Sequence, residues 1–138
     1  MYEFSTPMPY YKEHIDKLFE INKKLEKSYI SSVYFSLPTN SIDYCGFEKD
    51  RYNLQFETDF NYWKPLIEKC LDKSASFIYI LNSPNVYNYE NAKLNTSLET
   101  LDKLINNLKS IGCNKIRVSN PQLIGYINKY YKDIELYI

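Results

Sequence analysis

The sequence is short of glycine and histidine, and these shortages exclude several kinds of site. Its 138 residues include three glycines and one histidine. Neither the dinucleotide-binding G-x-G-x-x-G turn nor the phosphate-binding Walker A loop is present. The single histidine, His14, falls in a charged helical segment. We therefore expect neither Ser-His-Asp catalysis nor a metal site built on histidine.

The chain also lacks an excess of charge of either sign and a long apolar run. Its 17 basic and 17 acidic residues give a net charge of zero, which does not indicate nucleic-acid binding. No apolar run has the length of a membrane span, and there is no signal-peptide pattern. We expect a cytoplasmic protein with no membrane partner.

The cysteines follow no metal-binding pattern. Cys45, Cys70 and Cys113 lie far apart and form neither a C-x-x-C pair nor a zinc spacing. Cys70 falls on the apolar face of a predicted helix, and Cys113 follows a glycine that ends another helix. Free cysteines are commonly buried. We expect reduced, structural thiols, no metal and no cofactor.

What the sequence does contain is a regular alternation of strand and helix patterns. Short β-rich runs end in Ser, Asn or Pro, and stretches with apolar residues at helical spacing lie between them. This order predicts an α/β fold of parallel βα units in a single domain, residues 1–138. The predicted strands are 1–5, 30–37, 77–81, 116–118 and 134–138, and the predicted helices are 9–25, 61–73, 96–111 and 121–127.

Two helix starts are marked by caps. Thr96 and Glu99 form a capping box, which predicts that the third helix begins at Thr96. Asn120, followed by Pro121, is a start signal for the fourth helix.

Two architectures fit five parallel strands and four helices. One is an open doubly wound sheet, with the first strand between the second and the third. The other, which we favour, is the first half of a (β/α)8 barrel, with the strands in sequential order. A full barrel needs about 250 residues. The final apolar run, 134–138, is then expected to meet the remaining half of a barrel or a second copy of the chain.

Five parts of the sequence carry a resemblance to a known family: the strand Phe77–Asn82, the helix Leu101–Gly112, the strand and turn Cys113–Pro121, the Leu123–Ile124 pair, and the strand Ser32–Phe35 with the long loop that contains Arg51. Together they resemble the N-terminal barrel of the collagenase-like peptidase family, family U-thirty-two. The resemblance implies a barrel fold. Members of the family are mostly linked to hydroxylation of RNA or quinone precursors, often with an iron–sulfur cluster. The cluster cysteines of the family lie in later sequence that has no counterpart here.

Ligands of both architectures bind at the carboxyl ends of parallel strands. The residues expected to contact a polar ligand are Ser36, Asn82 and Ser119, which follow strands, and Arg51, in a loop 39–57 that would cover the site. The residues that follow strands are neutral, so we assign no catalytic residue. The function expected is that of the substrate-facing part of a barrel protein. The alternative is a non-catalytic interaction or scaffold module.

Overall fold

The computed structural model describes residues 2–36, 60–73, 76–81 and 91–138, apart from the side chains of residues 91–97 and 100. Strands and helices alternate along these ranges, as the sequence predicts. The strands are β1 (Tyr2–Pro7), β2 (Ser28–Phe35), β3 (Ser76–Ile80), β4 (Lys115–Arg117) and β5 (Glu135–Tyr137). The helices are α1 (Lys12–Lys24), α2 (Phe60–Asp72), α3 (Asn91–Ser110) and α4 (Pro121–Tyr130).

The five strands form one parallel sheet in the order β1-β2-β3-β4-β5. The predicted sequential order is confirmed, and the doubly wound alternative, with the first strand between the second and third, is wrong. Each strand is followed by a helix, and the next strand then lies beside the previous one and runs parallel to it. Because such connections are right-handed, the helices that they carry fall on one side of the sheet.

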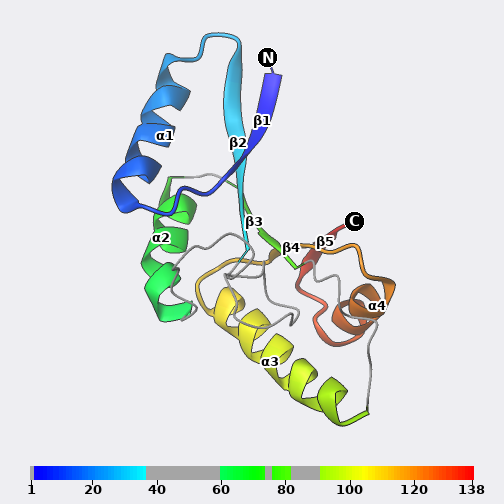
Figure 1. The fold of residues 1–138 in the computed structure, drawn as a ribbon. Coiled ribbons are helices and arrows are strands. Elements are labelled where there is room, and N and C mark those ends of the chain that lie inside the picture. The colour runs from blue at the N-terminus through cyan, green and yellow to red at the C-terminus, as the bar shows by residue number, and fades with distance from the viewer. Residues whose placement is uncertain (1, 37–59, 74–75, 82–90) are drawn as a thin grey trace.

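The arrangement of the helices follows this rule. In Figure 1 the four helices run along the left and lower side of the sheet, with α1 and α2 next to each other. The opposite side of the sheet carries no helix of the described part of the chain (Figure 1). The sheet therefore has one helix-covered face and a second face that these helices leave uncovered.

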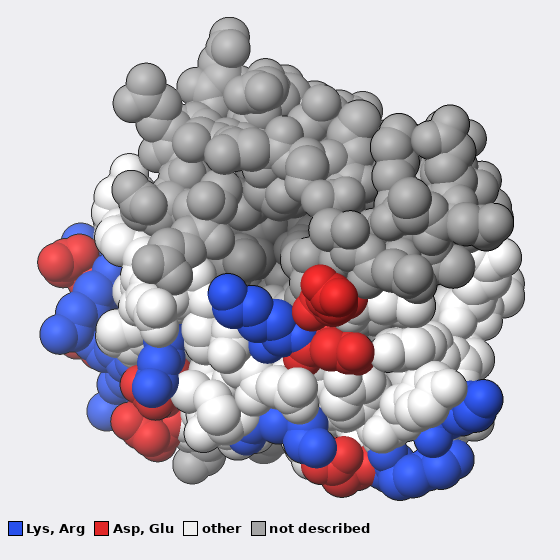
Figure 2. Space-filling model, turned by 90° about the horizontal axis from the view of Figure 1, so that it is seen from below, with Lys and Arg blue, Asp and Glu red and all other residues white. Residues whose placement is uncertain are grey.

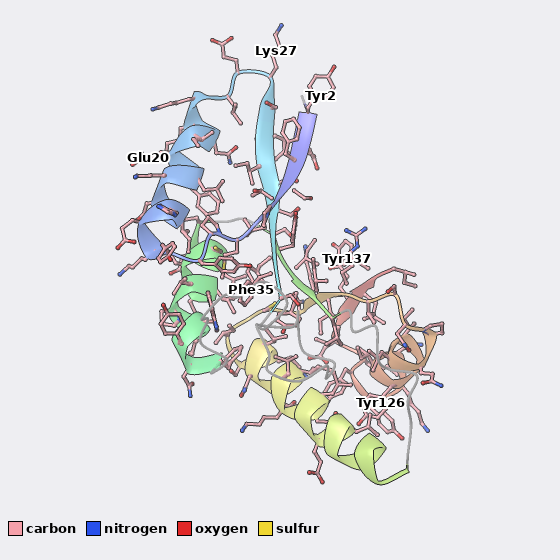
Figure 3. All side chains as sticks on the ribbon, in the orientation of Figure 1. Tyr2, Glu20, Lys27, Phe35, Tyr126 and Tyr137 are labelled. Carbon is pink, nitrogen blue, oxygen red and sulfur yellow. The ribbon has the colours of Figure 1, made fainter. Side chains whose placement is uncertain are left out.

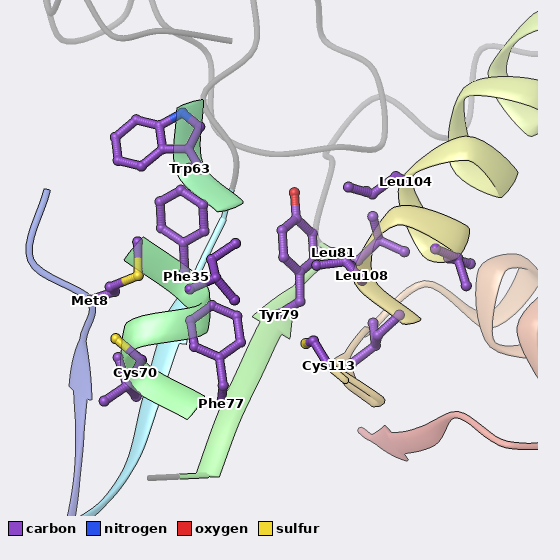
Figure 4. Packing of buried hydrophobic residues seen from close by; sticks show 14 of the residues in the cluster. Met8, Phe35, Trp63, Cys70, Phe77, Tyr79, Leu81, Leu104, Leu108 and Cys113 are labelled. Carbon is purple, nitrogen blue, oxygen red and sulfur yellow. The ribbon is translucent and has the colours of Figure 1, made fainter. Parts of the chain in front are cut away.

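The hydrophobic core lies between the sheet and the helices. On β3, Phe77 and Tyr79 are buried, whereas Ile78 and Ile80 between and beyond them are only half-buried. The same alternation places Phe35 of β2 on the helix side, and Figure 4 shows its ring beside Trp63 of α2. The buried side chains of the described residues form one cluster, which includes members of all four helices.

Helix α3 ends as the sequence predicts. Gly112 has a φ of 84°, a left-handed conformation that glycine adopts at low cost. Its N–H donates to the Lys109 carbonyl at 3.0 Å, and the Cys113 N–H donates to the Leu108 carbonyl at 3.0 Å. This pair of bonds is a Schellman motif, which pairs two otherwise orphan carbonyls. Cys113 and Leu108 are both buried beneath it.

The start of α3 is not where the capping box predicts. The helix begins at Asn91, five residues before Thr96, which lies inside it. The box is a local signal, and the backbone continues in helical form on its N-terminal side.

The last strand also differs from expectation. Ile134 is buried and Leu136 packs against the core, so helices already present cover most of the apolar face that was expected to need a partner; Ile138 remains exposed. What stays unpaired at β5, among the described strands, is its outer backbone edge.

The cap of α4 is confirmed and gives a first prediction. The Asn120 Oδ1 accepts from the N–H groups of Gln122, at 2.9 Å, and Leu123, at 3.2 Å. Asn120→Ala should lower the free energy of unfolding by roughly 1 kcal/mol, because two backbone donors, one of them buried, lose their acceptor. Urea unfolding followed by circular dichroism measures this. The control is Gln122→Ala, at the exposed neighbour, which should change stability by less than about 0.5 kcal/mol; equal effects would show that the cap contributes nothing.

Candidate ligand-binding face

The second face of the sheet is where polar side chains of several strands gather. Its members alternate with the buried residues, so their positions follow from the strand periodicity of two. From β2 to β5 they are Tyr34, Ser36, Ser76, Ile78, Ile80, Lys115, Arg117, Glu135 and Tyr137. We call this set the second face.

Strand β4 places two cations on this face. Ile116 is fully buried on the helix side, so Lys115 and Arg117 on either side of it point the other way. β4 is an interior strand, flanked by β3 and β5. Interior strands of a parallel sheet are normally apolar on both faces, because helices cover both. Two charges at alternate positions show that this face of β4 is polar, and Arg117 on it is exposed.

Lys115 is anchored toward the amino ends of the strands. Its Nζ donates to the Oγ of Ser76, the first residue of the neighbouring strand β3, at 2.9 Å. Further along the same sheet, the hydroxyls of Ser5 and Ser32 lie 2.6 Å apart, and Ser32 pairs in register with Ser76. These contacts form a row of hydroxyl groups that ends at one ammonium group.

Arg117 lies at the carboxyl edge, where β4 ends. It pairs in register with Ile80 of β3 on one side and with Tyr137 of β5 on the other. Tyr137 donates its hydroxyl hydrogen to the Glu135 carboxylate at 2.8 Å, and this bond raises the pKa of Tyr137. Figure 3 shows Tyr137 on the opposite side of the sheet from Tyr126 of α4. Arg117 is exposed, and its guanidinium has no hydrogen-bond or ion-pair partner in the described ranges.

Of the four ligand contacts predicted from the sequence, two lie among the described residues and two do not. Ser36 lies at the carboxyl edge, and its hydroxyl donates to the Ile80 carbonyl at 2.8 Å, so it ties β2 to β3. Ser119 is exposed, two residues beyond the end of β4. Ser36 and Ser119 therefore share this edge, on either side of β3. Arg51 and Asn82, and with them the loop 39–57, lie outside the described residues.

Lys115 and Arg117 were missed because the sequence was searched at the residues that follow each strand. The signal was available inside the strand. Lys115-Ile116-Arg117-Val118 alternates charged and apolar residues, which indicates one wet face. A parallel strand covered by helices on both sides would not carry charged residues at alternate positions. This pattern could therefore have identified Lys115 and Arg117 as candidate ligand contacts.

A second polar cluster lies between α3 and α4, away from the strand ends. The Asp102 carboxylate accepts from the Tyr126 hydroxyl, at 3.0 Å, and from the Tyr131 hydroxyl. Burial and these bonds to Asp102 raise the pKa of both tyrosines. A phenol held protonated beside a carboxylate is a poor acid at neutral pH, so we interpret this cluster as a structural link between the two helices.

The charges on the outer surface are mixed. In Figure 2, which views the molecule from below, Lys and Arg side chains are interspersed with Asp and Glu side chains. Asp16 illustrates the mixing, because it pairs with Lys69 at 2.5 Å and with Lys73 at 3.5 Å. Among the residues coloured in this view there is no broad patch of one sign. A charged ligand would therefore be attracted to this surface only by individual side chains.

The described part of the chain holds two buried cysteines and no cluster of metal-ligating residues. Burial raises the pKa of Cys70 to about 12 and that of Cys113 to about 11, so both stay as protonated thiols at neutral pH. In the same ranges, no group of three or more His, Cys, Asp or Glu residues is placed to hold a metal ion. None of the described helices has the length and apolarity to cross a membrane.

Comparison with known proteins gives no match to a protein-family model, to a curated protein or to a solved structure. What bears on function is the geometry of the second face and of the sheet edges.

Proposed function

We propose that this chain is the substrate-facing N-terminal part of a (β/α) barrel protein, similar to the collagenase-like peptidase family, that binds a polar ligand at the carboxyl ends of its strands. The observation that supports this is the sequential order of five parallel strands with the described helices on one face. In a (β/α)8 barrel the strands have the same order, the helices form the outer ring, and the other face of the sheet lines the interior.

The two edges of the sheet support the same proposal. β1 and β5 each have a neighbour on one side only among the described strands. On the helix side of these edges Tyr2 is 72% exposed, Phe4 is 53% exposed and Ile138 is 84% exposed. In a closed barrel, adjoining βα units would pair with both edges and cover such side chains. The partner is therefore the remaining half of a barrel or, failing that, a second copy of this chain.

The ligand site would combine Ser36 and Ser119 with Arg51 and Asn82, under the loop 39–57. A screen of small polar compounds against 15N-labelled protein tests this. We expect amide shifts to concentrate at the carboxyl ends of the strands, around residues 36, 80–82 and 117–120. Shifts confined to other regions, or no shifts with any compound, would count against a ligand site on this edge.

The competing proposal is a non-catalytic interaction module. One observation favours it: β1 presents a six-residue outer edge whose backbone groups have no strand partner in the described structure. Such an edge is a template for pairing with another chain. An interaction module would bind through this edge and would show no ligand at the strand ends, so the screen separates the two proposals.

Exposed edges give a prediction about association. We expect the purified chain to self-associate, and Phe4→Lys and Ile138→Lys each to shift it toward monomer, because a charge opposes docking of an apolar edge. Both side chains are exposed, so the fold should persist. Leu136→Lys is a poorer test, since Leu136 packs against the core.

Multi-angle light scattering over a concentration series measures the effect. The matched control is Ile21→Lys, because Ile21 is 51% exposed but lies on helix α1 and not on an edge strand. The proposal that the strand edges mediate association would be contradicted if the unchanged chain stays monomeric at all concentrations. It would also be contradicted if Ile21→Lys lowers the measured mass as much as the edge variants do.

A further inference from the structure

We propose that the second face binds an organic oxyanion, a carboxylate or phosphate group attached to an apolar body, with Arg117 holding the anionic group. This inference builds on the ligand site proposed above and names the chemistry of its ligand. It follows from the position of Arg117, from its surroundings on β3 and β5, and from the apolar residues next to it.

The case for an anion begins with the two cations of β4. Residues two apart on a strand lie about 6.6 Å apart along the backbone and on the same face, so Lys115 and Arg117 give this face two positive charges. Glu135 pairs in register with Lys115 and already accepts from Tyr137. Of the two cations of β4, Lys115 donates to the Ser76 hydroxyl, whereas Arg117 has no hydrogen-bond or ion-pair partner for its guanidinium among the described residues. A guanidinium binds carboxylate and phosphate groups through two parallel hydrogen bonds.

The residues around Arg117 are suited to contact the apolar body of a ligand whose anionic group binds Arg117. Tyr137 on β5 and Ile80 on β3 pair in register with Arg117, so an aromatic and an aliphatic side chain adjoin it. Tyr34 and Ile78 pair in register deeper on the same face, and both are half-buried. A planar or aliphatic body would cover these residues while its charged end reaches the carboxyl edge.

The position also matches where parallel sheets bind ligands. Arg117 is the last residue of β4, and Ser36 and Ser119 lie at the same edge. Ser36 uses its hydrogen toward the Ile80 carbonyl, which leaves its oxygen as an acceptor only. The charged contact therefore comes from Arg117, while the serines add polar groups around it.

Four probes separate the parts of this proposal: benzoate, phenyl phosphate, inorganic phosphate and benzyl alcohol. We expect benzoate or phenyl phosphate to shift the amides of residues 80, 117 and 137 in a saturable way. Inorganic phosphate lacks the apolar body and benzyl alcohol lacks the charge, so both should bind at least about tenfold more weakly. Preference between the first two distinguishes a carboxylate from a phosphate ligand.

Variants assign the binding to Arg117. Arg117→Gln should weaken benzoate or phenyl phosphate binding at least about tenfold, and Arg117→Lys should retain part of it, since the charge stays but the two-pronged geometry is lost. Lys12→Gln, an exposed cation on α1, is the control and should bind as the unchanged chain does. Equal binding by Arg117→Gln and the unchanged chain would overturn the proposal.

The outcome also separates this inference from the proposed function. If neutral polar compounds shift the strand ends but neither aromatic anion does, the ligand site stands and its anionic character is wrong. If no compound shifts the strand ends, both proposals fail.

Discussion

Replacement of Trp63 by alanine should lower the free energy of unfolding by about 3–5 kcal/mol. Trp63 is 1% exposed. Its ring lies 5.0 Å from that of Phe35 and 5.6 Å from that of Tyr10 (Figure 4 shows the first pair). These contacts join α2 to β2 and to the segment before α1. Truncation would remove a large buried surface and leave a cavity that a packed core closes only in part.

The neighbouring residue provides the control. Tyr62 lies 5.1 Å from the same ring, but it is 50% exposed. Tyr62→Ala should therefore cost about 1 kcal/mol or less. Because Trp63 is the only tryptophan of the chain, far-UV circular dichroism should follow urea unfolding in place of fluorescence. A loss below about 1 kcal/mol for Trp63→Ala would mean that α2 does not pack on β2 as described.

Stability should also fall steeply in alkaline solution, through the buried thiol of Cys70. Burial raises the pKa of Cys70 to about 12 in the folded protein, whereas an unfolded cysteine titrates near 8.5. Below pH 8.5 the thiol is protonated in both states and its contribution is complete. Above that pH the unfolded chain loses the proton first, so stability falls as pH rises toward the folded pKa. Between pH 9 and pH 11 the loss should be about 2–3 kcal/mol.

Cys70→Ala isolates this contribution from the other groups that titrate in the same range. The variant should be somewhat less stable at pH 7, because a small cavity forms, yet its stability should fall less between pH 9 and pH 11. Cys113→Ala should have a similar but smaller effect on the slope, since the pKa of Cys113 is raised only to about 11. Parallel pH profiles for the unchanged chain and Cys70→Ala would show that the thiol is not buried as described.

The sequence predicted the parts of the fold that depend on local rules. Helical spacing, strand-forming runs and turn residues predicted five strands and four helices, and the structure confirms their order. Gly112 and Asn120 were identified as helix-ending and helix-starting residues because their roles depend on backbone conformation and on a single side chain. Cys70 was expected to be buried because of its place on an apolar helix face, and it is.

Predictions that depend on distant parts of the chain were less successful. The capping box at Thr96 misplaced the start of α3, because a local cap does not decide whether the backbone before it is also helical. The apolar residues of the last strand were expected to need an external cover. Ile134 and Leu136 join the existing core instead, which the linear order of elements does not reveal.

The second face is the clearest case of what only the tertiary structure decided. A parallel strand is hydrophobic on both sides when helices cover both, and candidate ligand contacts were sought only at the residues that follow each strand. Which side each connection takes depends on the strand order, and only the assembled sheet fixes that order. The sequence by itself therefore determined the elements, their parallel direction and most of their caps. The tertiary structure decided that Lys115 and Arg117 share the face that carries none of the described helices, because residues on neighbouring strands become neighbours only when the sheet forms.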